Sequence, residues 1–132
     1  MIYILIFMFL FHIFDDFVLQ PICLSKLKCK EIWNDVNRQN NNLYKNDYKM
    51  ALFIHALSWS IMIHIPLMIC MIHMNQHYQI SLLSSILLNS IIHAFIDNLK
   101  ANKRKISLVI DQTIHFIQIM LTCLIFYLIL TI

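Results

Sequence analysis

The sequence contains no glycine, only two prolines, and only 13% charged residues in a chain of 132. Without glycine it lacks the residue that phosphate-cradling loops use to bring the backbone close to a ligand. So few charges cannot cover the surface of a water-soluble domain, which is about 25–35% charged. Hydrophobic residues make up 60% of the chain. This composition excludes a soluble globular domain and predicts an integral membrane protein.

Cysteine motifs and targeting signals are also lacking. The four cysteines show no C-x2-C spacing, so the sequence indicates neither a zinc knuckle nor a disulfide framework. The apolar N-terminus has no basic leading region and no small-residue cleavage site. It also carries Asp15 and Asp16 where the apolar stretch of a signal peptide should end. We therefore expect it to be retained as a first membrane span.

Four segments are apolar enough to cross a membrane as helices, for which about 20 predominantly apolar residues are needed. These segments are residues 2–19, 50–72, 80–96 and 106–130. Together they predict a single all-α transmembrane domain over residues 1–132, folded as a four-helix bundle.

The connections between the spans differ in length and charge. Residues 20–49 form a long polar connection whose start, ICLSKLKCKEIW, predicts a basic helix at the membrane interface. The asparagine-rich run that follows predicts a solvated loop. All ten Lys and Arg residues lie in this connection or in the short third one, residues 97–105. The positive-inside rule therefore places both connections in the cytoplasm and both termini on the other side.

The basic residues also bear on the partners of the protein. They form two clusters that flank spans and are not interleaved with aromatic side chains. We therefore expect membrane lipid, and no nucleic acid, as the partner. A homo-oligomer or a larger membrane complex stays open.

Ionisable residues inside the spans carry the functional signal. A charged residue at the centre of a span costs about 2.5–3.5 kcal/mol on insertion. Three spans nevertheless carry a His and an Asp four residues apart, which places both on one helix face. The second span adds one histidine at a comparable depth. The resulting layer, in the cytoplasmic half of the bundle, consists of His12, Asp16, His55, His93, Asp97, Asp111 and His115.

This layer predicts a polar site in the core of the bundle. Mixed His and Asp ligands suit zinc, with iron or manganese as alternatives, and seven ligands allow one ion or two. The general base of an enzyme would be Asp16, Asp97 or Asp111, or a hydroxide held by the metal. Four further polar residues extend the same stripes or motifs and are expected to orient the ligands: Gln20, Asn89, Lys100 and Gln112.

Other ionisable residues are expected to stay outside the site. His64 is nine residues from His55, about half a turn round the helix, and so faces another way. His73 and His77 flank the second connection and are expected to be solvated. Asp15 is about 100° from Asp16 on the helix and is the second choice for the functional acid of the first span.

Four short motifs, in order along the chain, resemble the domain of unknown function 3307 family of small multi-span membrane proteins of bacteria and phages. They are H-x3-D-F-x2-Q from His12, K-x5-H ending at His55, H-x2-I-D-x2-K from His93, and D-Q-x2-H from Asp111. The chain departs from the family pattern at Asp15, where a small residue, often glycine, is expected. The resemblance implies a membrane protein of bacterial or phage origin, which would lie in the bacterial cytoplasmic membrane, and singles out these polar positions. It supplies no activity.

Three functions stay open at this point. The first is a metal-dependent membrane hydrolase acting on a lipid or phosphate-bearing substrate at the cytoplasmic leaflet, with Lys100 and the basic connections attracting phosphate. The second is a transporter or channel for protons or metal ions, because buried His and Asp chains serve as proton relays. The third is an interaction protein whose His–Asp pairs only fix helix packing. Such contacts average about 0.6 kcal/mol, a small gain for seven ionisable groups in one layer.

Overall fold

The structure is a computed structural model that describes residues 1–20, 22–39, 43–73 and 78–131. Every regular element within these ranges is a helix, which confirms the all-α prediction. Four stretches of helix are long and apolar enough to cross a membrane. The first is α1 (Ile2–Phe14) with its continuation η1 (Asp15–Leu19), and the others are α4 (Asp47–His73), α5 (Gln79–Ala101) and α6 (Leu108–Thr131). Two short helices, α2 (Ile22–Leu27) and α3 (Lys30–Gln39), lie between the first and second of these.

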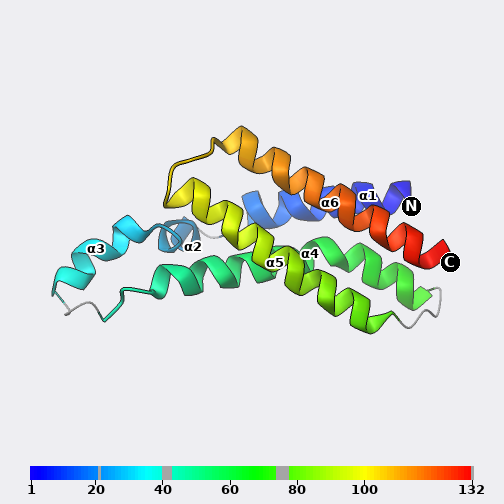
Figure 1. Cartoon of the computed structure of the whole chain (residues 1–132), viewed down its shortest axis with the longest axis horizontal. Coiled ribbons are helices and arrows are strands. Elements are labelled where there is room, and N and C mark those ends of the chain that lie inside the picture. Colours follow the sequence, from blue (N-terminus) through cyan, green and yellow to red (C-terminus); the bar gives the residue numbers. More distant parts are fainter. Residues whose placement is uncertain (21, 40–42, 74–77, 132) are drawn as a thin grey trace.

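The four long helices pack as a bundle. α4 contacts both α1 and α5, and α6 contacts both α5 and α1, so the contacts close a ring around one interior. Both termini lie at one end of the bundle, whereas α2, α3 and the connection between α5 and α6 lie at the other end (Figure 1). The two ends are named the terminal end and the connection end below.

The outer surface of the bundle is apolar. Large hydrophobic side chains are exposed on every long helix, among them Tyr3, Ile72, Ile80 and Val109, each more than 70% exposed. In the interior, more of the described buried side chains are polar or ionisable than apolar. This distribution is the reverse of that in soluble proteins. It suits a protein whose outer surface is covered by lipid, where backbone groups must be paired within helices.

An apolar core fills the interior toward the terminal end. It is built by Met8 of α1, Trp59, Ile63, Leu67 and Met71 of α4, and Ile119, Cys123 and Phe126 of α6. Seven ionisable side chains that the sequence singled out lie nearer the connection end of the same helices. The apolar core and these seven side chains thus lie toward opposite ends of the interior.

The observed helix bounds differ most from the predicted spans at α5. The sequence predicted a span ending at residue 96, because Asp97 and Lys100 looked like the start of a polar connection. The helix instead continues to Ala101. Asp97 is only 2% exposed, so the polar residues extend the helix because they face the interior rather than solvent.

The first connection is more ordered than the sequence predicted. The expected interfacial helix is divided into α2 and α3, with a break at Lys28 and Cys29. Asn34 and Asn37, predicted to lie in a solvated loop, belong to α3. The side chain of Asn37 accepts a hydrogen bond from the backbone N–H of Tyr44 at 2.9 Å, which ties α3 to the start of the next segment. Residues 40–42 of the asparagine run lie outside the described residues.

Asn102, just after α5, fastens this connection to the bundle. Its side-chain oxygen accepts a hydrogen bond from the backbone N–H of Lys30 at 2.6 Å. Its side-chain nitrogen donates to the backbone carbonyl of Lys28 at 3.0 Å. An exposed ion pair between Arg104 and Glu31 adds a further contact at 2.7 Å. The break between α2 and α3 is therefore held at a fixed place against the end of α5.

Replacement of Phe126 tests the apolar core. Phe126 is 1% exposed, and Phe126→Ala should lower the free energy of unfolding by about 3–5 kcal/mol, because the burial of the ring is lost and a cavity is left. Unfolding in mixed detergent micelles, followed by circular dichroism, measures this change. Leu124→Ala, at a neighbouring position that is 53% exposed, should change it by less than about 0.5 kcal/mol. Equal losses in the two variants would contradict the described packing.

Candidate metal centre

The His and Asp side chains of the predicted layer meet in the interior near the connection end. His55 Nε2 of α4 lies 3.5 Å from Oδ1 of Asp16 and 3.5 Å from Oδ2 of Asp97. His115 Nε2 of α6 lies 3.7 Å from Oδ1 of Asp97 and 3.5 Å from Oδ1 of Asp111. Helices that are far apart in the sequence thus deliver their ionisable groups to one place.

The two remaining members join the same cluster. His93 Nε2 lies 3.1 Å from His55 Nε2 and 3.9 Å from Oδ1 of Asp97. His12 Nδ1 lies 3.7 Å from Oδ2 of Asp16 and accepts a hydrogen bond from the indole N–H of Trp59 at 2.6 Å. All seven predicted candidates therefore lie together. The name His/Asp cluster is used for them below: His12, Asp16, His55, His93, Asp97, Asp111 and His115.

The two acids of the first span differ because the turn that carries them is a π-helix. In η1 the backbone N–H of Gln20 donates to the carbonyl of Asp15, five residues back, at 2.9 Å. Asp15 is buried but turns toward α4, where the hydroxyl of Ser58 donates to it at 2.9 Å. Asp16 faces His12 and His55. π-turns occur frequently at functional sites, and helical periodicity gave no sign of this one.

Two overlapping groups of the cluster could hold a metal ion, Asp16 with His55 and His93, or His93 with Asp97 and His115. In a tetrahedral zinc site with bonds of about 2.0–2.1 Å, the ligand atoms are about 3.4 Å apart. The first group has separations of 3.1 and 3.5 Å. The second has separations of 3.7 and 3.9 Å. The first group therefore needs less adjustment to bind an ion.

His93 belongs to both groups and is held most firmly. Its side chain is fully buried. The ring stacks against those of Trp59 and His115, with centroid distances of 4.1 and 4.0 Å. Such packing fixes the plane of the ring and so fixes the direction of its nitrogen lone pair, which is what a metal ligand requires.

Several polar atoms of the cluster have no hydrogen-bond partner among the described residues. They include Asp16 Oδ1, Asp111 Oδ1, His93 Nδ1 and both ring nitrogens of His115. Buried polar groups in proteins are nearly always paired. A cation with its bound water would supply partners for carboxylate oxygens and imidazole nitrogens together. The unpaired atoms therefore support a bound ion here.

Two lysines complete the charge arrangement, and the sequence analysis assigned only one of them to the site. Lys100 Nζ donates to Oδ2 of Asp111 at 2.5 Å and lies 3.6 Å from Oδ1 of Asp97. Lys28 Nζ donates to Oδ2 of Asp97 at 2.6 Å and is only 6% exposed. The sequence predicts Lys28 at the membrane surface. No signal in the sequence separates it from its neighbours Lys26 and Lys30, because its position depends on the break between α2 and α3.

Gln20 and Gln112 lie against the cluster, as the sequence predicted. Gln112 donates to Oδ2 of Asp16 at 3.3 Å and to Oδ2 of Asp111 at 3.2 Å, and its oxygen lies 3.0 Å from Nε2 of His12. The side-chain amide of Gln20, in the orientation that satisfies both ends, accepts a hydrogen bond from Lys28 Nζ at 2.8 Å and donates to the backbone carbonyl of Asp16 at 3.2 Å.

Asn89, the other predicted supporting residue, belongs instead to a second polar layer nearer the terminal end. It donates to the hydroxyl of Thr122 at 3.0 Å and accepts from the amide of Gln118 at 2.7 Å. Its amide also lies 3.3 Å from the hydroxyl of Ser85, which in turn lies 2.9 Å from Nε2 of His64. His64 is fully buried and lies in this layer. Helical periodicity predicted that His64 faces away from His55, but it could not predict its hydrogen-bond partners.

The histidines and cysteines that the sequence did not assign to the site are considered next. His73 is exposed at the end of α4, whereas His77 lies outside the described residues. Cys29, Cys70 and Cys123 are not disulfide-bonded. No described cysteine therefore contributes to a disulfide or to the two metal-binding groups.

A cavity of about 130 Å³ lies against the cluster at the connection end. It has room for about four water molecules at ~30 Å³ each. Its wall combines possible metal ligands with both lysines and with two apolar side chains. The lining residues are Asp16, Phe17, Gln20, Lys28, His55, Asp97, Lys100, Leu108 and Gln112.

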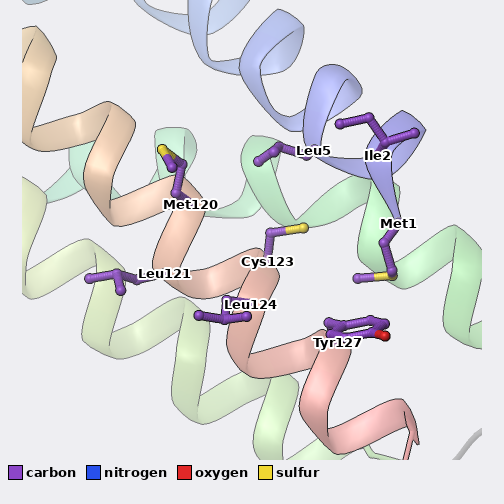
Figure 2. Close-up of a pocket in the computed structure, with 8 residues that line it drawn as sticks. All are labelled: Met1, Ile2, Leu5, Met120, Leu121, Cys123, Leu124 and Tyr127. Carbon is purple, nitrogen blue, oxygen red and sulfur yellow. The ribbon is translucent and has the colours of Figure 1, made fainter.

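A larger cavity, of about 420 Å³, lies between α1 and α6 near the terminal end (Figure 2). Its wall is almost wholly apolar, formed by side chains such as Leu5, Met120 and Leu124 (Figure 2). It contains none of the cluster residues. Room for an apolar chain without any acid, base or metal ligand offers no chemistry, so the candidate site is the smaller cavity.

Comparisons with protein-family models, with curated proteins and with solved structures give no match to this chain. The resemblance to the domain of unknown function 3307 family thus stays a prediction that rests on the four motifs. The function must be argued from the cluster itself.

Replacement of Gln112 tests how tightly the cluster is held. Gln112→Ala removes contacts to His12, Asp16 and Asp111 and leaves buried groups unpaired, which should lower the free energy of unfolding by about 1–3 kcal/mol. Thr113→Ala is the matched control, because the exposed hydroxyl of Thr113 bonds only to the carbonyl of Val109 in its own helix. That change should stay within about 0.5 kcal/mol. A loss no larger in Gln112→Ala than in the control would contradict the bridging role.

Proposed function

We propose that this protein is a metal-dependent integral membrane hydrolase whose ion is bound by the His/Asp cluster. The observation that carries the proposal is the position of His55 Nε2. It lies 3.1 Å from His93 Nε2, 3.5 Å from Oδ1 of Asp16 and 3.5 Å from Oδ2 of Asp97. Of these neighbours, Asp16 and His93 form with His55 one of the two groups that could hold an ion. Such mixed nitrogen and oxygen ligands suit zinc, and also iron or manganese.

The geometry favours one ion over two. Both possible metal-binding groups include His93, and its Nε2 atom, which faces both groups, has a single lone pair to give. The two groups are therefore alternatives for one ion. We infer that Asp16, His55 and His93, the group with the shorter separations, bind it. The other four members of the cluster, His12, Asp97, Asp111 and His115, surround these ligands.

Such a site fits hydrolysis. A bound divalent ion polarises the substrate and makes water a better nucleophile at neutral pH. In the reaction the oxygen of water bonds to the substrate, the bond to the leaving group breaks, and one proton passes from water to the leaving group. Asp16 and Asp97 line the cavity and are the carboxylates best placed to carry that proton. Asp111 acts through Lys100, which it holds by a hydrogen bond at 2.5 Å.

A transporter is the second candidate, favoured by the polar layer around Asn89 and His64. This layer places further polar groups between the cluster and the terminal end. Beyond His64, however, the described interior is closed by Leu67, Met71 and Phe126. A conducting path would need this apolar core to open, whereas a hydrolase needs access from one end only. The unpaired atoms also argue against a purely structural role for the cluster, because in that role each buried polar atom would have a hydrogen-bond partner.

Metal binding by variants of the neighbouring acids Asp16 and Asp15 tests the proposal. We expect the purified protein, reconstituted with zinc, iron or manganese, to retain one ion per chain by mass spectrometry. Asp16→Asn and His93→Ala should abolish binding, because each removes a ligand. Asp15→Asn is the matched control, since Asp15 bonds to Ser58 rather than to the cluster, and it should retain the ion.

The absence of bound metal in the wild-type protein would overturn the enzyme proposal. Proton flux into liposomes that is lost in Asp16→Asn and kept in Asp15→Asn would favour the transporter in its place.

We also propose that the chain lies in the bacterial cytoplasmic membrane with its connection end in the cytoplasm, where it acts on a lipid or phosphate-bearing substrate. The ten Lys and Arg residues of the chain lie in the first and third connections, which share that end of the bundle (Figure 1). Basic residues are retained on the cytoplasmic side of membrane proteins. Lipid headgroups at that leaflet would then lie beside the smaller cavity.

Cysteine labelling tests this orientation. In a chain from which the native cysteines have been removed, His73→Cys at the terminal end should react with a membrane-impermeant maleimide in intact cells. Lys45→Cys at the connection end should react only after the cells are permeabilised. Both positions are exposed, so accessibility within the protein does not distinguish them. The opposite pattern would show an inverted orientation.

A further inference from the structure

We propose that the 130 Å³ cavity binds the phosphoryl group of a phosphate ester between Lys28 and Lys100. This inference rests on the proposed metal site and names the substrate class of that site. Lys28 becomes a substrate-binding residue, although it belongs to the connection between the first two spans and not to a span.

The two ammonium groups converge on one carboxylate. Lys28 Nζ lies 2.6 Å from Oδ2 of Asp97, and Lys100 Nζ lies 3.6 Å from Oδ1 of the same residue. Both side chains line the cavity together with Asp16 and His55. An anion in the cavity would thus contact two ammonium groups as well as the bound ion. A phosphoryl group offers several oxygens for such contacts, and lysine binds phosphate as a point charge.

The charge of the cavity favours an anion only when an ion is bound. Two carboxylates line it, those of Asp16 and Asp97, and two ammonium groups, those of Lys28 and Lys100. Asp111, whose carboxylate accepts a hydrogen bond from Lys100, adds a third negative charge, so the net formal charge of these groups is −1. A divalent ion changes it to +1, in a protein interior where charges act more strongly than in water. Phosphate should therefore bind to the metal-loaded protein and not to the metal-free one.

Lys28 is held in place by groups outside the His/Asp cluster. Its ammonium group donates to the side chain of Gln20 at 2.8 Å, and its backbone carbonyl accepts from Asn102 at 3.0 Å. A lysine that is only 6% exposed has given up much of its hydration, so it gains from a dianionic ligand. Its fixed position also lowers the ordering cost of binding.

The apolar part of the wall indicates what carries the phosphoryl group. Phe17 and Leu108 line the cavity and are themselves 63% and 57% exposed on the outside of the bundle. The cavity is large enough for a phosphate headgroup but not for a nucleotide or a sugar chain. An apolar chain attached to the phosphate would lie along these exposed side chains, so a lipid phosphate fits better than a soluble ester.

Calorimetric titration of the full-length protein in detergent tests the inference, with inorganic phosphate and a short-chain phosphatidic acid as two separate probes. We expect zinc-loaded protein to bind both, and binding to be lost without zinc. Lys28→Met and Lys100→Met should each weaken phosphate binding at least about tenfold, equal to 1.4 kcal/mol. Each should still retain one zinc ion. Lys26→Met, an exposed lysine of the same connection, is the control and should bind phosphate normally.

The outcomes separate this inference from the metal site. If wild-type protein retains zinc but binds neither probe, or if both lysine variants bind phosphate normally, the phosphoryl site is wrong and the metal site stands. If wild-type protein retains no metal, both proposals fail. Tighter binding of phosphatidic acid than of inorganic phosphate identifies a lipid as the source of the phosphoryl group, whereas equal binding identifies a soluble ester. If Lys28→Met does not fold, Lys100→Met still tests the phosphoryl site, because retained zinc shows that this second variant is folded.

Discussion

The carboxylate of Asp97 is the group on which the rest of the interior depends. It is only 2% exposed and accepts a hydrogen bond from Lys28 at 2.6 Å. A buried carboxylate is stable only if its lost hydration is offset by close partners. Around Asp97 those partners come from the first connection and from three long helices: Lys28, His55, His93, Lys100 and His115. The rotation of each helix is therefore constrained by what it must bring to this one acid.

The sequence allowed the fold class and most of this cluster to be predicted, because both follow from periodicity within a helix. Apolar length identifies spans, and a spacing of four residues places His12 with Asp16 and Asp111 with His115 on one face. Partners between helices are not encoded in this way. Asn89 shares a face with His93, yet it pairs with Thr122 and Gln118. Lys28 and the π-turn at Asp15 depend on breaks in helical regularity, and a periodic pattern cannot show where these occur.

Because the bundle has an apolar surface, unpaired polar atoms in its interior are stronger evidence for a ligand than they would be in contact with water. In water, an unpaired carboxylate oxygen or imidazole nitrogen would simply be hydrated. Inside a bundle with an apolar surface, polar groups must find partners among themselves. In the layer around His64 both ring nitrogens lie within 2.9 Å of an oxygen, and among its described buried side-chain atoms only Gln118 Oε1 has no partner. Asp16, Asp111 and His115, by contrast, keep atoms without partners. That contrast within one interior separates a layer that serves packing from a layer that can bind a ligand.

The position of the cluster along the bundle also bears on whether the proposed site is reached from one end or from both. The 130 Å³ cavity meets the cluster from the connection end, while Met8, Leu67 and Phe126 close the interior toward the terminal end. An enzyme that takes its substrate from one leaflet requires this asymmetry, because water that entered from both ends would hydrate and screen the charges that act on the substrate. A transporter requires a second arrangement of the same helices, in which the apolar core parts. With Asp97 tying three long helices to one point, such a rearrangement would break several buried contacts at once, and the packing thus favours chemistry at a fixed site.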